Sequence, residues 1–306
     1  MKLSRMNQKA SNNRIKPLID ADILRYEVEF GVEFLENGVK FIHNFDSVIE
    51  LLHHKIDIIL EEVWATEPPT LYLTDDRHRV SRANSRGSSE VYIPNFRETM
   101  TVTKEYKGHR KQDKPFHYHN LTEYLISNFD CKVAKGIEAD DLISVDQNLN
   151  NNSDSDYETI ICSRDKDLRI TPGLHYTWAC GKSPAIMPYR VDRLGTLEYK
   201  ENRKLFGTGL KFFYSQMLMG DQADNIPGIP KLGPAYAFKL LNECESEQEL
   251  FDRVYAEYEK YCTKAYPDTP DKTLEYYTEQ ATLLWIIQEL DDSGVPVGYK
   301  APLPKQ

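Results

Sequence analysis

Lys16-Pro-Leu-Ile-Asp-Ala-Asp22 is a short apolar run that ends in two carboxylates. A run of this kind is typical of a buried strand in a parallel sheet. Phe45–Trp64 then has apolar residues at helical spacing, and Thr70-Leu-Tyr-Leu-Thr74 is a second apolar run, followed by Asp75 and Asp76. The order strand, helix, strand predicts a parallel crossover. The chain therefore begins as an α/β protein whose strands carry acids at their carboxyl ends.

The same alternation continues along the chain. The pattern predicts a helix over 117–129, a strand over 132–134, a helix over 138–147, a polar loop over 148–156 and a strand over 157–163. From about Lys211 the spacing is mostly helical, with a Gly- and Pro-rich turn at 226–234. Five tyrosines recur there at near-helical spacing and are expected to pack the helices: Tyr255, Tyr258, Tyr261, Tyr276 and Tyr277. We expect an α/β core over residues 15–205 and a helical region over 206–306.

The composition describes a globular protein. Of 306 residues, 40% are hydrophobic and 28% charged, which excludes a disordered, collagen-like or coiled-coil chain. No apolar run reaches the roughly 20 residues that a membrane helix needs, and the first residues lack the apolar centre of a signal peptide. The five cysteines form no CxxC pair, which favours reduced thiols. We therefore expect a cytoplasmic protein with no membrane partner.

The charge is unevenly distributed. The net charge is -10, yet between Arg77 and Lys114 ten Lys and Arg residues stand against four Asp and Glu, so this segment carries +6 and the remainder -16. The segment, which we call the basic strip, contains Tyr106-Lys-Gly-His-Arg-Lys111. An acidic body with one basic strip can meet a polyanion along that strip.

Five groups of acids follow predicted strands or lie near predicted helices: Asp20/Asp22, Asp75/Asp76, Glu138/Asp140/Asp141, Asp165/Asp167 and Asp221/Asp224. The carboxyl ends of parallel strands meet at one edge of a sheet, so these acids should converge. Spacing favours this, because Asp165 and Asp167 share a side if extended, and Asp221 and Asp224 share a face on a helical turn. One acid at a strand end more often forms a turn, but five such groups predict a site for divalent cations, Mg²⁺ or Mn²⁺. Two such ions can support phosphodiester cleavage.

A second motif lies downstream of the last acids. Gly228-Ile-Pro-Lys-Leu-Gly233 has the form of a hairpin between two helices, in which glycines permit close approach of the backbone. Its main-chain amides could meet a phosphate backbone without reading bases. An ordinary Pro- and Gly-rich helix connection would look the same. The flanking Asp221 and Asp224 favour the DNA-binding interpretation, because they couple the hairpin to the acidic site.

In this order the motifs resemble the 5′-nuclease superfamily, which comprises flap endonucleases, phage 5′-to-3′ exonucleases and the 5′-nuclease domain of bacterial DNA polymerase I. The resemblance runs from about Ile15 to Leu241 and rests on six segments: Ile19-Asp20, Leu73-Thr-Asp75, Tyr106-Lys-Gly-His-Arg110, Gly136-Ile-Glu-Ala-Asp-Asp141, Ser163-Arg-Asp-Lys-Asp167 and Gly220-Asp-Gln-Ala-Asp-Asn-Ile-Pro-Gly-Ile-Pro-Lys-Leu-Gly233. It implies a PIN-like, mostly parallel sheet flanked by helices, a helical arch over 77–118, and a helix-three-turn-helix around 219–241.

The resemblance also implies roles for individual residues. Asp20, Asp75, Glu138 and Asp140 would hold the first of two Mg²⁺ ions, with Asp141 nearby, and Mn²⁺ would substitute. Asp165, Asp167, Asp221 and Asp224 would serve the second. Lys107 and Arg110 would contact the scissile phosphate, with Tyr106 and Lys111 beside them on the DNA. Gly228, Ile229, Pro230, Lys231, Leu232 and Gly233 would bind duplex, with K⁺ in the hairpin.

The implied activity is 5′-to-3′ exonuclease or flap endonuclease cleavage at the 5′ ends of duplex or flap DNA, with RNA primers as further substrates. The protein would be a monomeric, phage-type replication or recombination enzyme that meets replication proteins. One alternative is a haloacid-dehalogenase-type phosphatase, whose acids resemble Asp20, Asp22 and Gly220-Asp-Gln-Ala-Asp224, but those last acids should follow a strand. Another is a non-catalytic DNA-binding protein, which would not need so many acids.

Overall fold

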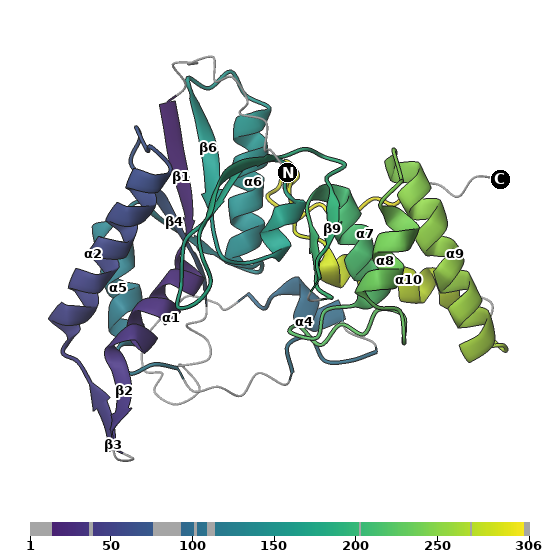
Figure 1. The fold of residues 1–306 in the computed structure, drawn as a ribbon, viewed down its shortest axis with the longest axis horizontal. Helices are drawn as coiled ribbons and strands as arrows, with labels where there is room; N and C mark the ends of the chain where they lie inside the picture. Colours follow the sequence, from purple (N-terminus) through teal and green to yellow (C-terminus); the bar gives the residue numbers. More distant parts are fainter. Residues whose placement is uncertain are drawn as a thin grey trace.

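The computed structural model describes residues 14–36, 39–75, 93–100, 103–108, 114–201, 203–269 and 271–302. A six-stranded sheet lies at the centre of the region formed by residues 14–191 (Figure 1). Its strands, in spatial order, are β5 (Cys131–Ala134), β4 (Thr70–Thr74), β1 (Arg14–Asp20), β6 (Tyr157–Cys162), β7 (Gly173–Thr177) and β8 (Ile186–Val191). The first five run parallel and β8 is antiparallel to β7. The predicted mostly parallel α/β sheet is confirmed.

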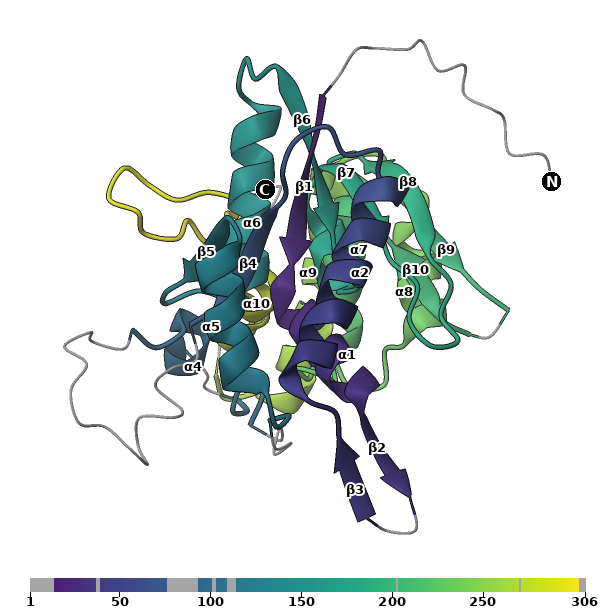
Figure 2. The ribbon, with the colours of Figure 1, turned by 90° about the vertical axis from the view of Figure 1, so that its left-hand side faces the viewer.

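Helices cover both faces of this sheet. On one face lie α1 (Ala21–Val32), α2 (Phe45–Glu62) and α5 (Tyr118–Asn128), and on the other lies α6 (Ala139–Asn151) (Figures 1 and 2). Successive strand residues point to opposite faces, so Ile19 packs with the α1 side and Leu18 with the α6 side. Both are almost fully buried, which explains the continuous apolar run.

One local prediction needs correction, and several elements were not predicted. The helix α6 continues to Asn151, so residues 148–151 belong to it and not to a polar loop. The helix α1 was not predicted, because Arg25 and Glu29 lie on its buried side and interrupt the apolar period. The hairpin of β2 (Glu33–Glu36) and β3 (Val39–Ile42), which projects from the end of α1 in Figure 2, was also not predicted. The strands β7 and β8 were missed as well.

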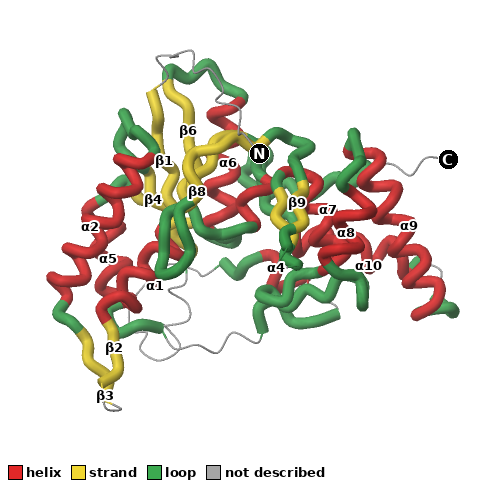
Figure 3. The backbone as a smooth tube through the Cα atoms, viewed as in Figure 1, coloured by secondary structure: helices red, strands yellow, loops and turns green. Residues whose placement is uncertain are grey.

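Beyond the six-stranded sheet, most of the regular structure is helical. A short 3-10 helix, η1 (Asp167–Ile170), leaves the sheet, and the strands β9 (Leu197–Tyr199) and β10 (Leu205–Gly207) pair antiparallel. The helices α7 (Gly209–Met219), α8 (Pro234–Leu241), α9 (Glu247–Ala265) and α10 (Lys272–Leu284) then gather beside the α6 face of the sheet (Figure 3). A strap over residues 285–302 ends the described chain.

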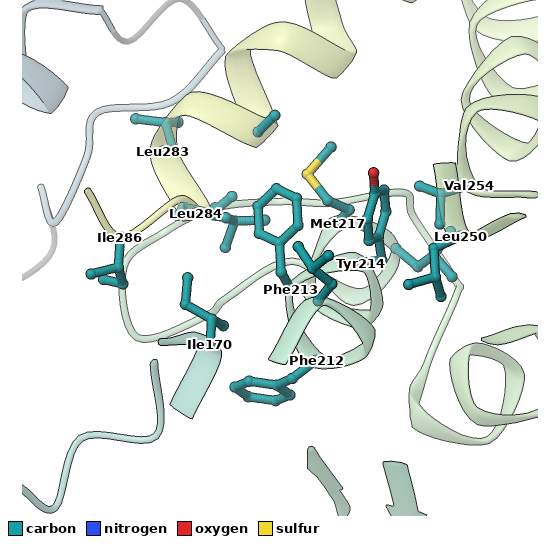
Figure 4. Close-up of a cluster of buried hydrophobic side chains, with 14 of the residues drawn as sticks. Ile170, Phe212, Phe213, Tyr214, Met217, Leu250, Val254, Leu283, Leu284 and Ile286 are labelled. Carbon is teal, nitrogen blue, oxygen red and sulfur yellow. The ribbon is translucent and has the colours of Figure 1, made fainter. Parts of the chain in front are cut away.

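The helical region and the α6 face of the sheet share one hydrophobic core. Phe213 and Met217 of α7 lie between α9 and the end of α10, where Leu250 and Leu284 meet them (Figure 4). Tyr255, Tyr258, Tyr261, Tyr276 and Tyr277 pack in this cluster, which confirms their predicted packing role. None of the described helices combines the length and the apolar character needed to cross a bilayer.

Of the predicted arch over 77–118, the structure describes residues 93–100, 103–108 and 114–118. They include a short helix, α4 (Phe96–Met100). The rest of the arch, with Arg110 and Lys111, lies outside the described residues, and so does Asp76.

Candidate active site

One large cavity opens where the parallel strands end. Its volume is about 1420 Å³. The adjacent strands β5, β4, β1 and β6 are parallel, so the segments that follow them reach the same edge of the sheet. Eight of the nine predicted metal ligands line the cavity, together with Asp22: Asp20, Asp75, Glu138, Asp140, Asp165, Asp167, Asp221 and Asp224. The structure therefore gathers acids from five separate parts of the chain.

Asp20, the last residue of β1, is among the most buried of these acids. It is only 4% exposed, and its carboxylate accepts hydrogen bonds from Ser163 Oγ at 2.7 Å and from the Ile23 backbone N–H at 3.2 Å. Ser163 Oγ also accepts from the Asp165 N–H at 2.9 Å, so one buried hydroxyl connects two acids. Burial, with repulsion from Asp22, raises the pKa of Asp20 to about 7. Sequence reasoning missed Ser163, whose position at the end of β6 was its only signal.

Asp22 connects the elements that surround the cavity. Its carboxylate pairs with Arg25 at 2.7 Å and accepts from the Thr74 backbone N–H at 3.1 and 3.2 Å. The hydroxyl of Thr74 in turn accepts from the Ala139 N–H at 2.9 Å. These contacts join the start of α1, the end of β4 and the start of α6, and so fix the three elements that deliver acids to the cavity.

Glu138 and Asp140 stand at the start of α6. Burial and repulsion from Glu138 raise the pKa of Asp140 well above its ordinary value. Burial would also raise the pKa of Glu138, but attraction to Lys107 and Arg97 outweighs it and lowers that pKa to about 2. The pKa values of these two acids, two residues apart, are therefore shifted in opposite directions, and the Lys107 ammonium is the largest attractive charge acting on Glu138.

Lys107 lines the cavity, and its ammonium group contacts the acids. Its Nζ is 2.5 Å from Glu138 Oε1 and 3.8 Å from Asp224 Oδ2. Tyr106 lies beneath it, 7% exposed, and its hydroxyl donates to Glu138 Oε2 at 2.9 Å and to Asp224 Oδ2 at 3.2 Å. The resemblance implies that Tyr106 contacts DNA. In the structure its ring is buried, and its hydroxyl orients two carboxylates. Asp224 thus lies on the Glu138 side of the cavity.

Asp165 and Asp167 form the other side of the cavity. They do not follow an extended chain, because Asp167 starts η1 and its N–H donates to Asp165 Oδ1 at 2.8 Å. Gln216 Nε2 donates to Asp167 Oδ1 at 2.6 Å. Burial and repulsion from Asp165 raise the pKa of Asp167 to about 7. Lys166 Nζ pairs with Asp221 and lies 3.7 Å from Asp167, so this side also contains an ammonium group.

Asp221 and Asp224 lie on a tight turn and not on the predicted helical turn. Gly220, at φ 70°, ends α7, and two backbone hydrogen bonds then close the turn between Asp221 and Ile226, at 2.8 and 2.7 Å. Gly220 can adopt this φ because it has no Cβ. The turn brings both carboxylates to the cavity wall.

Asp141 is the predicted metal ligand that the cavity does not include. It is fully buried, and both of its oxygens accept from Arg97, at 2.7 and 2.8 Å. Its carboxylate also accepts from the Glu138 N–H at 3.0 Å and from the Ile287 N–H at 2.8 Å. Arg97, counted in the basic strip, is therefore a buried partner of Asp141 and presents no charge to a polyanion.

The hairpin between α7 and α8 is fixed by hydrogen bonds from its own amides to other groups of the protein. The Gly228 N–H donates to Gln280 Oε1 at 2.9 Å and the Ile229 N–H to the Leu218 carbonyl at 2.9 Å. The Leu232 N–H donates to the Ile229 carbonyl at 3.2 Å. Three of the amides expected to meet a phosphate backbone are thus already bonded within the protein, whereas Pro230 and Lys231 form an exposed tip.

The donor set has the chemistry that Mg²⁺ and Mn²⁺ prefer, because it consists of carboxylate oxygens. Within the described part of the chain, however, no three His, Cys, Asp or Glu side chains stand close enough together to hold one ion. The ammonium groups of Lys107 and Lys166 lie among these acids. Burial, with repulsion from a neighbouring acid, nevertheless raises the pKa values of Asp20 and Asp167 to about 7.

No family model matches the chain. It is 31% identical over 245 residues to DNA polymerase I of Bacillus subtilis (strain 168), a match that covers 78% of this chain and 24% of that protein. It is 28% identical over 167 residues to a 5′-3′ exonuclease of Buchnera aphidicola subsp. Schizaphis graminum (strain Sg), covering 52% of this chain and 53% of that protein. The matches therefore span about a quarter and about half of these relatives.

Among solved structures, the T5 5′-exonuclease with bound zinc matches 89% of this chain and 100% of that chain, at 14% identity and a TM-score of 0.45. A structural likeness this weak does not support a statement about fold or function. The two sequence relatives cover 78% and 52% of this chain. They confirm the resemblance of this chain to the 5′-nuclease superfamily.

Proposed function

We propose that this chain is a structure-specific, metal-dependent 5′-nuclease. It hydrolyses phosphodiesters at the 5′ ends of duplex or flap DNA, as a 5′-to-3′ exonuclease or flap endonuclease of the phage replication or recombination type. The observation that carries the proposal is the gathering of eight carboxylates and Lys107 around one cavity at the carboxyl edge of a parallel sheet. Such a density of buried negative charge is costly unless cations neutralise it.

Two groups of acids would hold two Mg²⁺ ions, with Mn²⁺ as a substitute. Asp20, Asp75, Glu138 and Asp140 would hold one ion, and Asp165, Asp167, Asp221 and Asp224 the other, directly or through water; water would be the route for Asp224, which lies on the Glu138 side of the cavity. When bound, the ions supply an activated water and a charge that stabilises the leaving oxygen. Because the side chains must close around each ion, the ammonium groups of Lys107 and Lys166 have to leave the carboxylates that they contact.

Lys107 would then turn from Glu138 to the scissile phosphate. Burial would lower its pKa, but the surrounding carboxylates outweigh burial and raise it, so the group stays charged at neutral pH. A fixed ammonium group at the phosphate stabilises the negative charge that develops as the bond breaks. Tyr106 continues to orient Glu138 through its hydroxyl.

Duplex binding would use the hairpin as a helix-three-turn-helix in the helical region 206–306, beside the α/β core 15–205. The exposed Lys231 would contact a phosphate without reading a base. Arg110 and Lys111 would add contacts on the cavity side, and K⁺ would bind in the hairpin. We also propose that the enzyme acts as a monomer in the host cytoplasm, accepts RNA–DNA hybrids, and meets other replication proteins.

The phosphatase alternative is not favoured. It requires the Gly220–Asp224 acids to follow a strand, and they follow the helix α7. A non-catalytic DNA-binding protein is not favoured either, because acids without metal ions would repel the DNA that the hairpin binds.

The proposal is tested by cleavage of 5′-labelled flap, nicked, blunt and RNA-primed duplexes in Mg²⁺, with EDTA as control and p-nitrophenyl phosphate as the phosphatase substrate. We expect metal-dependent release of short 5′ products. Asp165→Asn should abolish turnover and leave DNA binding largely intact. Full activity in EDTA, or hydrolysis of p-nitrophenyl phosphate alone, would contradict the proposal.

Variants of two lysines separate chemistry from binding. Lys107→Ala should lower the cleavage rate by orders of magnitude with an unchanged dissociation constant. Lys231→Ala should weaken duplex binding equally across sequences and reduce the salt slope by about one unit. Lys132→Ala, on the far edge strand β5, is the matched control and should change neither. A sequence-selective loss in Lys231→Ala would contradict the proposed role of the hairpin.

A further inference from the structure

Two residues with left-handed backbone conformations face each other beside the cavity. Lys107 has φ 53° and Asn225 has φ 63°. Residues other than glycine are sterically strained in this conformation because of their Cβ, although asparagine tolerates it better than lysine. Strain of this kind persists only where surrounding contacts enforce it, and it concentrates at functional sites.

Two hydrogen bonds join the segments that carry these residues. The Lys107 N–H donates to the Asp224 carbonyl at 3.0 Å, and Asn225 Nδ2 donates to the Glu105 carbonyl at 2.9 Å. The Glu105 carbonyl also accepts from the Gly108 N–H at 3.1 Å, so the chain folds tightly around Lys107. The backbone of Lys107 is thus clamped to the turn that carries Asp221 and Asp224.

That turn is a rigid support. Besides the two bonds that close it, the Ala223 N–H donates to Asp221 Oδ1 at 2.8 Å. Behind it, Gly220 and Gly228 pack backbone against backbone, so closely that a Cβ on Gly228 would lie 2.2 Å from Gly220 N. A clamp fixed to such a support can hold a strained neighbour in place.

We infer that Asn225 is a positioning residue for Lys107. Its side-chain amide holds the Glu105–Gly108 segment against the acidic turn, keeps Lys107 at positive φ, and thereby directs the ammonium group into the cavity. Without that amide, Lys107 relaxes to negative φ and its Nζ leaves the reacting phosphate. The inference rests on the proposed function, in which Lys107 stabilises the transition state.

The test compares Asn225→Gly with a matched control. Glycine adopts positive φ without strain, so this variant removes the amide and leaves the turn conformation accessible. Arg203→Gly relieves the same kind of strain, at φ 63°, in the exposed β9–β10 turn away from the cavity. We expect Asn225→Gly to lower kcat on a 5′-flap substrate about 10- to 100-fold, with KM and DNA affinity within about twofold. Arg203→Gly should match the wild type.

A double-mutant cycle and hydrogen exchange identify the route of the effect. In a Lys107→Ala background, Asn225→Gly should cost no more than about twofold, because the two changes remove the same contribution. The Lys107 amide should exchange faster in Asn225→Gly than in the wild type. Asn225→Asp keeps the backbone preference but loses the donor, and it should behave like Asn225→Gly in both measurements.

Three results would overturn the inference: full kcat in Asn225→Gly, an equal loss in the presence and absence of Lys107, or unchanged exchange at Lys107. The failure of the proposed function is a separate result, because it would show as absence of cleavage by the wild type. Hydrogen exchange would still decide whether Asn225 positions Lys107.

Discussion

Loss of the Arg97 guanidinium should lower the free energy of unfolding far more than loss of any exposed cation. Arg97 is 1% exposed and Asp141 is fully buried, and they share two hydrogen bonds. Arg97→Met removes both bonds, and a third at 2.6 Å to the Trp285 carbonyl. Among the described residues, Asp141 then keeps the backbone N–H groups of Glu138 and Ile287 as donors but no cation, which leaves a buried charge uncompensated. Removing one partner of such a pair costs about 3–5 kcal/mol.

Replacing both partners separates the net contribution of the ion pair to stability from the destabilisation caused by one unpaired buried charge. Arg97→Met with Asp141→Leu removes both charges of the pair, so the stability of this double variant should return to within about 2 kcal/mol of the wild type. The assay is urea unfolding at pH 7, followed as a double-mutant cycle. Arg193→Met is the matched control, because Arg193 pairs with Glu247 at 3.0 Å on the surface and should cost about 0–1 kcal/mol.

The same cycle separates a structural role for Asp141 from the metal-ligand role that its motif implies. A structural role predicts that Asp141→Asn lowers the free energy of unfolding in EDTA as much as in Mn²⁺. A loss below about 1 kcal/mol in Arg97→Met, or single losses that simply add in the double variant, would refute the ion-pair reasoning.

Three further predictions follow from burial and backbone geometry. Burial and a neighbouring acid raise the pKa of both Asp20 and Asp167 to about 7, so cation binding should release roughly 1.5 protons from the two at pH 6.5 and roughly 0.2 at pH 8. Calorimetric Mn²⁺ heats should therefore depend on the ionisation enthalpy of the buffer at pH 6.5, and identical heats in two buffers would contradict this. Burial lowers the pKa of His175 to about 4, so its neutral form stabilises the fold above the unfolded pKa and this contribution is lost as the pH falls. Between pH 7 and 5 the loss is about 2 kcal/mol, and His175→Gln should lack it in urea unfolding; parallel profiles would exclude this role. Gly228→Ala should lower the free energy of unfolding by at least about 2 kcal/mol, because Gly228 has φ 58° and a Cβ would clash with Gly220 N. Gly233→Ala is the control, because a Cβ on Gly233 meets open space. Its stability should be within about 0.5 kcal/mol of the wild type in the same assay.

The parallel sheet was predictable because its central strands are buried on both faces. Leu18 and Ile19 face opposite sides, and each meets a hydrophobic cluster, so the sequence shows an uninterrupted apolar run. The convergence of acids followed from strand direction alone. Elements with polar residues on buried faces were missed. In α1 these are Arg25 and Glu29, and in β7 it is His175, which is 3% exposed.

The detail of the site depended on contacts between distant segments. Arg97 meets Asp141 across 44 residues, and Lys166 meets Asp221 across 55, so no local spacing could show either pair. Charge counting placed Arg97 on a DNA-facing strip, because it cannot distinguish a solvated arginine from a buried one. The helical spacing of Asp221 and Asp224 was misleading because Gly220 ends α7 one residue earlier.

The most direct measurement of the central claim is anomalous scattering from crystals of the protein grown with Mn²⁺. The account predicts two peaks inside the cavity, one in contact with Asp20 and Glu138 and the other with Asp165 and Asp221, with the ammonium groups of Lys107 and Lys166 displaced from those carboxylates. Full occupancy of a Mn²⁺ site elsewhere with none in the cavity, or lysines that keep their present contacts, would contradict it.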